Sequence, residues 1–180
     1  MQQHIGLGCT HMKLAVYIAN RPDTADYQQM TEFRALQKGD IAAINLACGN
    51  GWRKVFNVYA KLVAALGEPY QSAHPKPATW QDYRDSHLLQ RHSKTALLFS
   101  APSFPLAPNV THLIMGKTYA NQLLRQANLF DQLVWVEPYL ALLPKQRLIV
   151  CPYFDYRQLS NAKLARLVEI IHAMDKRLPA

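Results

Sequence analysis

The chain is poor in the features that define several large protein classes. Its 180 residues include only three cysteines, Cys9, Cys48 and Cys151, and no two of them form a CxxC pair. Cysteines this sparse argue against a disulfide framework and favour a reduced, cytoplasmic setting. No apolar run approaches the roughly 20 residues that span a bilayer, and the amino terminus has no basic segment followed by an apolar one. We therefore expect a cytoplasmic protein with no secretory signal and no membrane partner.

Several catalytic and metal-binding signatures are also missing. Neither GxSxG nor HExxH occurs, and the seven histidines show no metal-ligand spacing. His87 and His92 are five residues apart, whereas two ligands on one helix face stand four apart. Gly116 and Lys117 have the context of a phosphate-binding loop, but Thr111 stands where that motif requires its first glycine. We expect no metal ion and no cofactor, and we reject a P-loop nucleotide triphosphatase.

The sequence does contain a surplus of positive charge and an ordinary apolar content. Lysine and arginine number 20 against 12 acidic residues, which gives a formal net charge of +8. That surplus favours DNA, RNA or a nucleotide as the partner. Because the basic residues are scattered and form no dense block, a soluble basic protein without a nucleic-acid role is an equal alternative. Length and apolar content predict a single domain over residues 1–180.

Short apolar segments alternate with helical patterns along the chain. The segments that predict strands are residues 13–19, 95–100, 110–115, 133–136 and 148–150, and a further apolar segment spans 41–47. The segments with helical spacing are residues 24–38, 52–66, 79–90, 118–126 and 161–176. Alternating strands and helices predict a three-layer α/β/α fold with a mostly parallel central sheet of about four or five strands.

The densest group of polar and aromatic side chains follows the last predicted strand. Tyr153 and Tyr156 offer faces for base stacking, and Arg157 can pair with a phosphate. Asp155 could position a water or act as a base, and Asn161 lies at the start of the final helix. In open α/β sheets, ligands usually bind at this end of the strands.

The same loop also has a purely structural interpretation. Phe154 would then belong to the core, Asp155 would cap a turn, and Ser160 or Asn161 would cap the last helix. By the same reasoning, His112 in a predicted strand is a buried imidazole with its hydrogen bonds satisfied.

Other polar residues follow the remaining predicted strands. They are Asn20, Arg21 and Asp23 after the first strand, Arg53 and Lys54 in the first turn of a helix, and Lys117 after Gly116. Positive charge in a first turn opposes the helix macrodipole, and a bound phosphate would relieve that conflict. The alternative is that these basic side chains are simply solvated. Because parallel strands end at one edge of a sheet, we predict that these residues and the loop from Tyr153 to Arg157 form one cationic pocket.

The order of motifs in the last third of the chain is similar to that of a known family. Residues 110–120 read VTHLIMGKTYA, and residues 147–161 begin RLIVCPY and end LSN. This order resembles the last third of the uracil-DNA glycosylase-like superfamily, in which a later strand ends in a His-Pro-Ser motif that Pro152 partly matches. The resemblance implies a three-layer α/β/α fold and removal of damaged bases after base flipping.

Two positions depart from that family's pattern. Cys151 stands where the family's histidine would stabilise the uracil oxyanion. The first strand ends in residues 20–23 (NRPD) instead of a glycine-rich loop that activates water, although Asn20 and Asp23 would lie near the family's catalytic polar residue. The resemblance therefore implies a glycosylase-like member that lacks base removal or has a different chemistry.

Our leading hypothesis is binding of nucleic acid or a nucleotide phosphate at the carboxyl edge of the sheet. In an enzymatic version, Asp23 or Asp155 would activate water to hydrolyse a base–sugar bond while Arg157 holds the phosphate. The rival is a non-enzymatic interaction protein or homodimer with aromatic side chains exposed on its helices. Those aromatics would be Tyr59, Trp80 and Tyr83. A third possibility is a small-molecule enzyme with Cys151 as its nucleophile.

Overall fold

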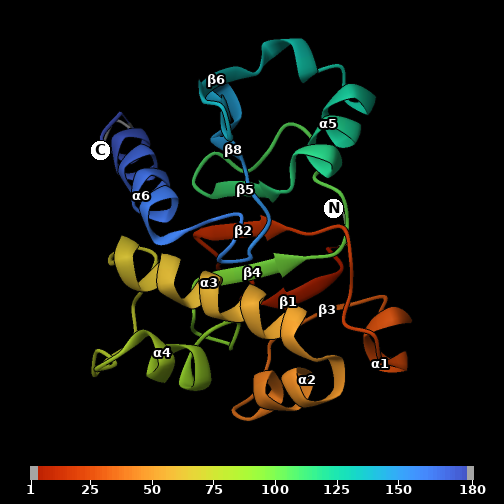
Figure 1. Ribbon diagram of the computed structural model, residues 1–180, viewed down its shortest axis with the longest axis vertical. Coiled ribbons are helices and arrows are strands. Elements are labelled where there is room, and N and C mark those ends of the chain that lie inside the picture. The colour runs from red at the N-terminus through yellow and green to blue at the C-terminus, as the bar shows by residue number, and fades with distance from the viewer. Residues whose placement is uncertain (1–3, 178–180) are drawn as a thin grey trace.

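Residues 4–177, which the computed structural model describes, form six α-helices around one eight-stranded sheet (Figure 1). The strands are β1 Gly6–Gly8, β2 Leu14–Tyr17, β3 Phe33–Arg34, β4 Thr95–Leu98, β5 Thr111–Met115, β6 Val134–Glu137, β7 Leu140–Leu143 and β8 Leu148–Cys151. The helices are α1 Ala25–Gln28, α2 Asp40–Cys48, α3 Asn50–Leu66, α4 Trp80–Ser86, α5 Lys117–Gln126 and α6 Asn161–Asp175. Short 3-10 turns at Phe130–Gln132 and Pro144–Gln146 flank the β6–β7 hairpin.

The sheet is mixed and larger than the sequence predicts. Its strand order is β3-β1-β4-β2-β5-β8-β7-β6. The four central strands β4, β2, β5 and β8 are parallel to one another. On one side β1 pairs antiparallel with β4, and on the other β7 pairs antiparallel with both β8 and β6. The α/β class is confirmed, but the predicted mostly parallel sheet of four or five strands is wrong, because antiparallel strands extend both sides of the parallel centre.

Buried side chains fill both faces of the central strands. In β2, Leu14 and Val16 face the core beneath α3, whereas Ala15 and Tyr17 face a second core on the other side. Successive side chains of a strand point to opposite faces, so a strand buried on both faces has an unbroken apolar sequence. The first core also includes α2, α4 and α6, and the second includes α5 (Figure 1). Helices therefore cover both faces of the sheet.

The prediction of one helix over residues 24–38 is wrong. Only α1 is helical there, and Phe33–Arg34 form β3, which pairs with β1. Arg21 accounts for the early end of the helix, because its Nη1 donates hydrogen bonds of 2.8–3.3 Å to three carbonyl oxygens between residues 27 and 30. Those oxygens would otherwise accept bonds from the next helical turn. The apolar spacing in this segment carries no sign of that contact.

Besides β3, the strands β1 and β7 lie outside the segments that the sequence predicts as strands. β1 is only three residues long and contains Gly6 and Gly8. A Cβ at either glycine would collide with a backbone carbonyl oxygen in the segment that forms β4, so the close approach of these strands requires glycine. β7 directly follows the turn at Pro138 and Tyr139 and returns alongside β6. The apolar segment 41–47 forms most of helix α2.

The helices with strong apolar periodicity lie close to their predicted positions. They are α3, α5 and α6, each within two residues of its predicted bounds. A capping box begins α4: the Thr79 side chain accepts from the Asp82 amide, and the Asp82 carboxylate accepts from the Thr79 amide. Within residues 4–177, no helix combines the length and the apolar character that crossing a membrane requires.

The aromatic side chains assigned to a protein partner lie mainly in the core. Tyr59 and Tyr83 are fully buried, with exposed fractions of 0% and 1%. The Tyr59 hydroxyl donates to the carbonyl of Ala96 in β4, and Trp80 is half-buried between the cations of Lys61 and Arg84. The prediction that Tyr59 and Tyr83 face a partner is therefore wrong, because both side chains lie on the buried faces of their helices.

Candidate functional site at the carboxyl edge of the sheet

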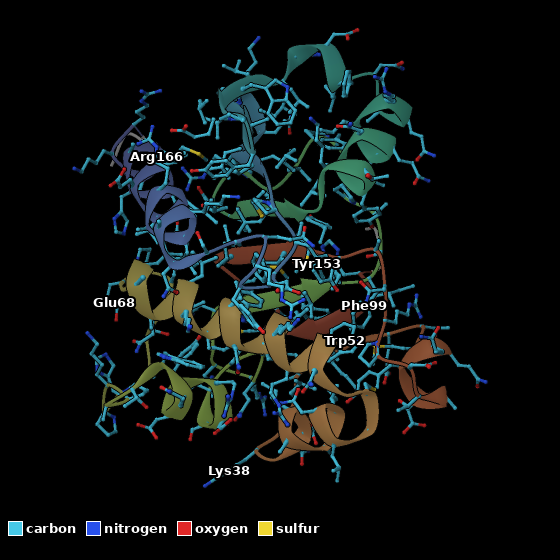
Figure 2. The ribbon with its side chains drawn as sticks, in the orientation of Figure 1. Lys38, Trp52, Glu68, Phe99, Tyr153 and Arg166 are labelled. Carbon is cyan, nitrogen blue, oxygen red and sulfur yellow. The ribbon has the colours of Figure 1, made fainter. Side chains whose placement is uncertain are left out.

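The four central strands end together at one edge of the sheet, as the sequence predicts for parallel strands. The residues that follow or closely follow them are Asn20, Phe99, Gly116 and Pro152. Across this edge the Tyr153 hydroxyl donates to Asn20 Oδ1 at 2.9 Å. The Phe99 ring centroid lies 6.4 Å from that of Trp52 in α3, and Figure 2 shows Tyr153, Phe99 and Trp52 on this side of the molecule. Segments more than 130 residues apart thus meet here.

A pocket of about 410 Å³ opens at this edge beside β5 and β8. Three segments build it: the β5–α5 turn, the loop between β8 and α6, and the β6–β7 hairpin. We call it the edge pocket, and its lining residues are Gly116, Lys117, Trp135, Pro138, Tyr139, Val150, Cys151, Pro152, Tyr153, Arg157, Gln158 and Lys163.

The β5–α5 turn directs the start of a helix toward the edge pocket. Gly116 has a φ of +96°, a conformation that favours glycine. Its amide donates to the Cys151 carbonyl at 2.8 Å and so ties the ends of β5 and β8 together. Helix α5 begins at the next residue, Lys117, and is ten residues long. The partial positive charge of the first helical turn therefore adds to the side-chain charge at this pocket.

Three basic side chains line the edge pocket, and no aspartate or glutamate does. Lys117 Nζ lies 4.7 Å from the ring centroid of Trp135, and Lys163 Nζ lies 4.7 Å from that of Tyr139. Within residues 4–177, neither lysine nor Arg157 forms a salt bridge. Cations that are not neutralised by carboxylates, set among aromatic rings, favour an anionic ligand with a flat apolar part.

Asp155 and Lys54 form a second cluster next to the loop that lines the edge pocket. Lys54 Nζ lies 3.0 Å from Asp155 Oδ2 and 5.0 Å from the ring centroid of Tyr156. The amide of Arg157 donates to Asp155 Oδ1 at 2.9 Å, which caps the turn as the structural interpretation predicts. That amide bond, followed by the Lys54 ammonium, lowers the pKa of Asp155. Its carboxylate therefore stays ionised and is a weak base.

Arg21 follows the end of β2 but does not line the edge pocket. Its guanidinium holds the carbonyl oxygens after α1 and stacks over Phe99, 5.6 Å from the ring centroid. The sequence predicts that Arg21, Lys117 and Arg157 line one pocket. Only Lys117 and Arg157 do so.

Three other candidate residues stand apart from the edge pocket. Asp23, Arg53 and Asn161 are exposed and do not line it. Asn161 is the first residue of α6, and its neighbour Ser160 is the cap, accepting from the Lys163 amide at 3.4 Å. The prediction that one of that pair caps the helix is confirmed.

Cys151 lines the edge pocket, and its buried thiol is unreactive at neutral pH. Its side chain is 1% exposed, and its Sγ lies 3.8 Å from the carbonyl oxygen of Ile114. Burial raises the pKa of the Cys151 thiol to about 12. A neutral buried thiol does not act as a nucleophile at neutral pH, which argues against the third possibility, a small-molecule enzyme with Cys151 as its nucleophile.

Comparison with known proteins gives one family match. Residues 5–172 match DUF6942, a family of unknown function. The chain belongs to the DUF6942 family. No curated protein and no solved structure gives a significant match.

Three lining residues of this DUF6942 chain were not anticipated from its sequence. Trp135 and Tyr139 come from the β6–β7 hairpin, and Lys163 from the first turn of α6. The hairpin was missed because β7 was not recognised, so no signal placed its aromatic residues beside Lys117. A lysine in a first turn, against the macrodipole, was the one available clue to Lys163.

The described part of the DUF6942 chain offers no ready metal site. Residues 4–177 contain no group of three or more histidine, cysteine, aspartate or glutamate side chains arranged to hold an ion. The chemistry available at the edge pocket is therefore that of ammonium and guanidinium groups, backbone amides and aromatic rings.

Proposed function

We propose that this protein binds single-stranded nucleic acid at the edge pocket, with a phosphate on the basic side chains and a base stacked on the aromatic rings. The observation that carries the proposal is the lining itself. Lys117, Arg157 and Lys163 converge on one pocket that no carboxylate lines. The formal net charge of +8 would steer a polyanion toward the protein as a whole.

The phosphate would meet two kinds of donor in this pocket. The Arg157 guanidinium can form two parallel hydrogen bonds to phosphate oxygens, and the Lys117 ammonium supplies a point charge. The amides of the first turn of α5 supply further donors aligned with the helix dipole. These contacts carry no base specificity, since they recognise only the backbone.

The base would stack on an aromatic side chain beside the phosphate. Trp135, Tyr139 and Tyr153 all line the pocket, and Trp135 is 41% exposed. Stacking of this kind is worth about 1–3 kcal/mol per base and requires an unpaired base with a free face. This requirement favours single strands over duplexes.

Binding without base removal fits the site better than hydrolysis. The Asp155 carboxylate has both oxygens engaged, by Lys54 and by the Arg157 amide. Asp23 is exposed and outside the edge pocket, and buried Cys151 stands where the glycosylase-like resemblance requires a histidine. A base poised to activate water would instead need a raised pKa and a free lone pair.

Fluorescence anisotropy with fluorescein-labelled oligothymidine tests the proposal. At about 50 mM salt, the double variant Lys117→Ala/Arg157→Ala should bind at least tenfold more weakly than the unmodified chain. The slope of log affinity against log salt should become shallower by about 1.4, because two phosphate contacts are lost. A duplex of the same length should bind more weakly than the single strand.

Lys38→Ala is the charge control for this experiment, and it removes one positive charge where the double variant removes two. Lys38 is exposed and projects far from Tyr153 in Figure 2, so its loss changes the net charge but not the edge pocket. Its affinity should stay within twofold of the unmodified chain. Equal losses of affinity in the control and the double variant would show that binding depends only on general charge attraction. A gel assay for base release from uracil-containing DNA tests hydrolysis separately, and we expect no release.

A second candidate function is self-association through strand β6. This strand is the last in the sheet, so one side of its backbone has no neighbouring strand within residues 4–177. Val134, Trp135 and Val136 are 52%, 41% and 36% exposed. An apolar edge strand can pair with a second copy of itself. Sedimentation velocity would detect such a dimer, and Val136→Lys should return it to monomer; a monomer at all concentrations would remove this candidate.

A further inference from the structure

A second pocket, of about 540 Å³, lies on the face of the sheet opposite α3. We call it the face pocket, and its lining residues are His4, Thr10, Met12, Tyr17, Phe33, Leu98, Ser103, Pro105, Leu106, Ala107, Val110 and His112. None of these belongs to a helix. Loops and strand side chains line the pocket, which opens to solvent.

The lining of the face pocket carries no lysine, arginine, aspartate or glutamate. Most of its surface comes from aliphatic and aromatic side chains such as Met12, Leu98 and Phe33. A charged ligand would lose its hydration here without a partner of opposite charge, at a cost of several kcal/mol. The lining therefore selects an uncharged and largely apolar molecule.

One buried polar pair stands in this apolar surface. The Tyr17 hydroxyl lies 3.1 Å from His112 Nδ1, and His112 Nε2 lies 3.2 Å from the carbonyl oxygen of Ala107. The two side chains are 1% and 4% exposed. His112 is thus the satisfied buried imidazole that the sequence predicts. Burial lowers its pKa to about 4, with a small further lowering from Arg147 against a raising by the Ala107 bond.

The two hydrogen bonds of His112 determine which atom donates and which accepts in each of them. A carbonyl oxygen only accepts, so His112 Nε2 must carry the proton and donate it to Ala107. The neutral Nδ1 must then accept from the Tyr17 hydroxyl. Within residues 4–177, His112 is the sole hydrogen-bond partner of that hydroxyl. The Tyr17 hydroxyl uses its one proton in this bond, and its oxygen can still accept a hydrogen bond.

We infer that the face pocket is a second binding site, which takes an uncharged, largely apolar molecule that donates one hydrogen bond to the Tyr17 oxygen. The volume of the pocket lies within the range of small-molecule sites, which are mostly apolar with a few placed polar groups. The site is independent of the nucleic-acid proposal, because it shares no lining residue with the edge pocket.

N-phenyl-1-naphthylamine is a suitable probe, since it is uncharged, aromatic and carries one N–H donor, and it fluoresces in apolar surroundings. We expect saturable binding of one probe per chain. Filling the pocket from two separate segments, with Met12→Trp or with Val110→Trp, should weaken binding at least tenfold. Tyr17→Phe removes the accepting hydroxyl together with its bond to His112, and it should weaken probe binding about fivefold, the value of one neutral hydrogen bond.

Matched controls distinguish this site from other apolar surfaces. Trp135→Ala alters the edge pocket and the exposed β6 strand, and it should leave probe affinity within twofold. The sulfonated analogue 8-anilino-1-naphthalenesulfonate has the same rings with a negative charge, and it should fail to displace the probe. Far-UV circular dichroism and the thermal midpoint confirm that each variant is folded.

Three results would overturn the inference. They are an absence of saturable probe binding, affinity that neither folded filling variant lowers by more than twofold, and loss of the probe in Trp135→Ala. Displacement by the sulfonated analogue at equal affinity would contradict the uncharged class of ligand.

Discussion

The edge pocket has three lysine or arginine side chains in its lining, whereas the face pocket has none and contains a buried tyrosine–histidine pair. Both pockets adjoin strand β5. This strand contributes His112 near its start to the face pocket, and the residues just after its end, Gly116 and Lys117, to the edge pocket. One strand thus borders two pockets of different chemistry.

The difference follows from where a side chain leaves the strand. Along the face of a sheet, side chains are buried by neighbouring strands and by covering segments, so a charge there lacks water and a neutral pair is favoured. At the end of a strand the chain turns into solvent, so lysine and arginine keep their hydration and the next helix adds its dipole. Under the two proposals, burial therefore decides which pocket takes a neutral ligand and which takes an anionic one.

The largest expected effect concerns the neutral imidazole of the face pocket. His112 has a pKa of about 4 when folded and about 6.5 when unfolded. The unfolded chain therefore binds an extra proton between these values, and the stability supplied by neutral His112 is lost as the pH falls through them. Between pH 7.5 and 4.5 the loss should be about 2.5 kcal/mol.

Urea unfolding at the two pH values measures this loss. The variant His112→Gln has no proton to bind, so its own decrease should be smaller by that amount. Carboxylates contribute equally to both proteins and cancel in the difference. Identical pH slopes would show that the His112 site is more hydrated than its 4% exposure implies.

The next effect compares one tyrosine hydroxyl from each pocket. Tyr17→Phe leaves buried His112 Nδ1 without its donor and should lower the free energy of unfolding by about 1–3 kcal/mol. Tyr153→Phe removes an exposed bond to Asn20 and should change it by no more than about 0.5 kcal/mol. Urea titration of both variants at pH 7.5 is the measurement. Equal decreases in the free energy of unfolding for the two variants would contradict the difference in burial between the two hydroxyl groups.

A smaller effect separates the aromatic part of the edge pocket from its charge. Trp135→Ala should weaken oligothymidine binding about fivefold, or about 1 kcal/mol, through lost stacking. Unlike Lys117→Ala, it should not change the salt slope, because no phosphate contact is removed. Anisotropy titrations at three salt concentrations distinguish the two variants, and a changed slope for Trp135→Ala would contradict a stacking role.

The smallest effect tests whether the floor of the edge pocket is sealed. With native protein at pH 7.5, iodoacetamide should label half-buried Cys48 and spare Cys9 and Cys151. In denaturant all three should react. Mass spectrometry of tryptic peptides gives the pattern. Rapid labelling of Cys151 in the native protein would mean that its thiol is accessible, against a pKa raised to about 12.

Several features of the edge could be predicted from the sequence because they depend on neighbours along the chain. The strand before Gly116 and the helix after it follow from an apolar run, a glycine and a 3.6-residue period, and all three are present. The caps at Thr79 and Ser160 follow from the same local rules. Lys117, Tyr153 and Arg157 were placed at one edge because parallel strands end together.

Other features depended on contacts between distant segments and could not be predicted. The guanidinium of Arg21 ends α1, and nothing in the local sequence indicates that it reaches those carbonyl oxygens. Lys54 forms an ion pair with Asp155, which lies 101 residues away in the sequence, so this carboxylate is not a free base. The face pocket itself was not anticipated, since no motif marks a cavity that forms between loops.

The amino-acid sequence alone determined the α/β class, the strongly periodic helices and the surplus of positive charge, because periodicity, caps and composition act over a few neighbouring residues. Only the tertiary structure decided which charges are neutralised, which strands extend the sheet, and which side chains line each pocket. The physical reason is that ion pairing, strand pairing and burial depend on distances in space, and these bring together residues more than a hundred positions apart.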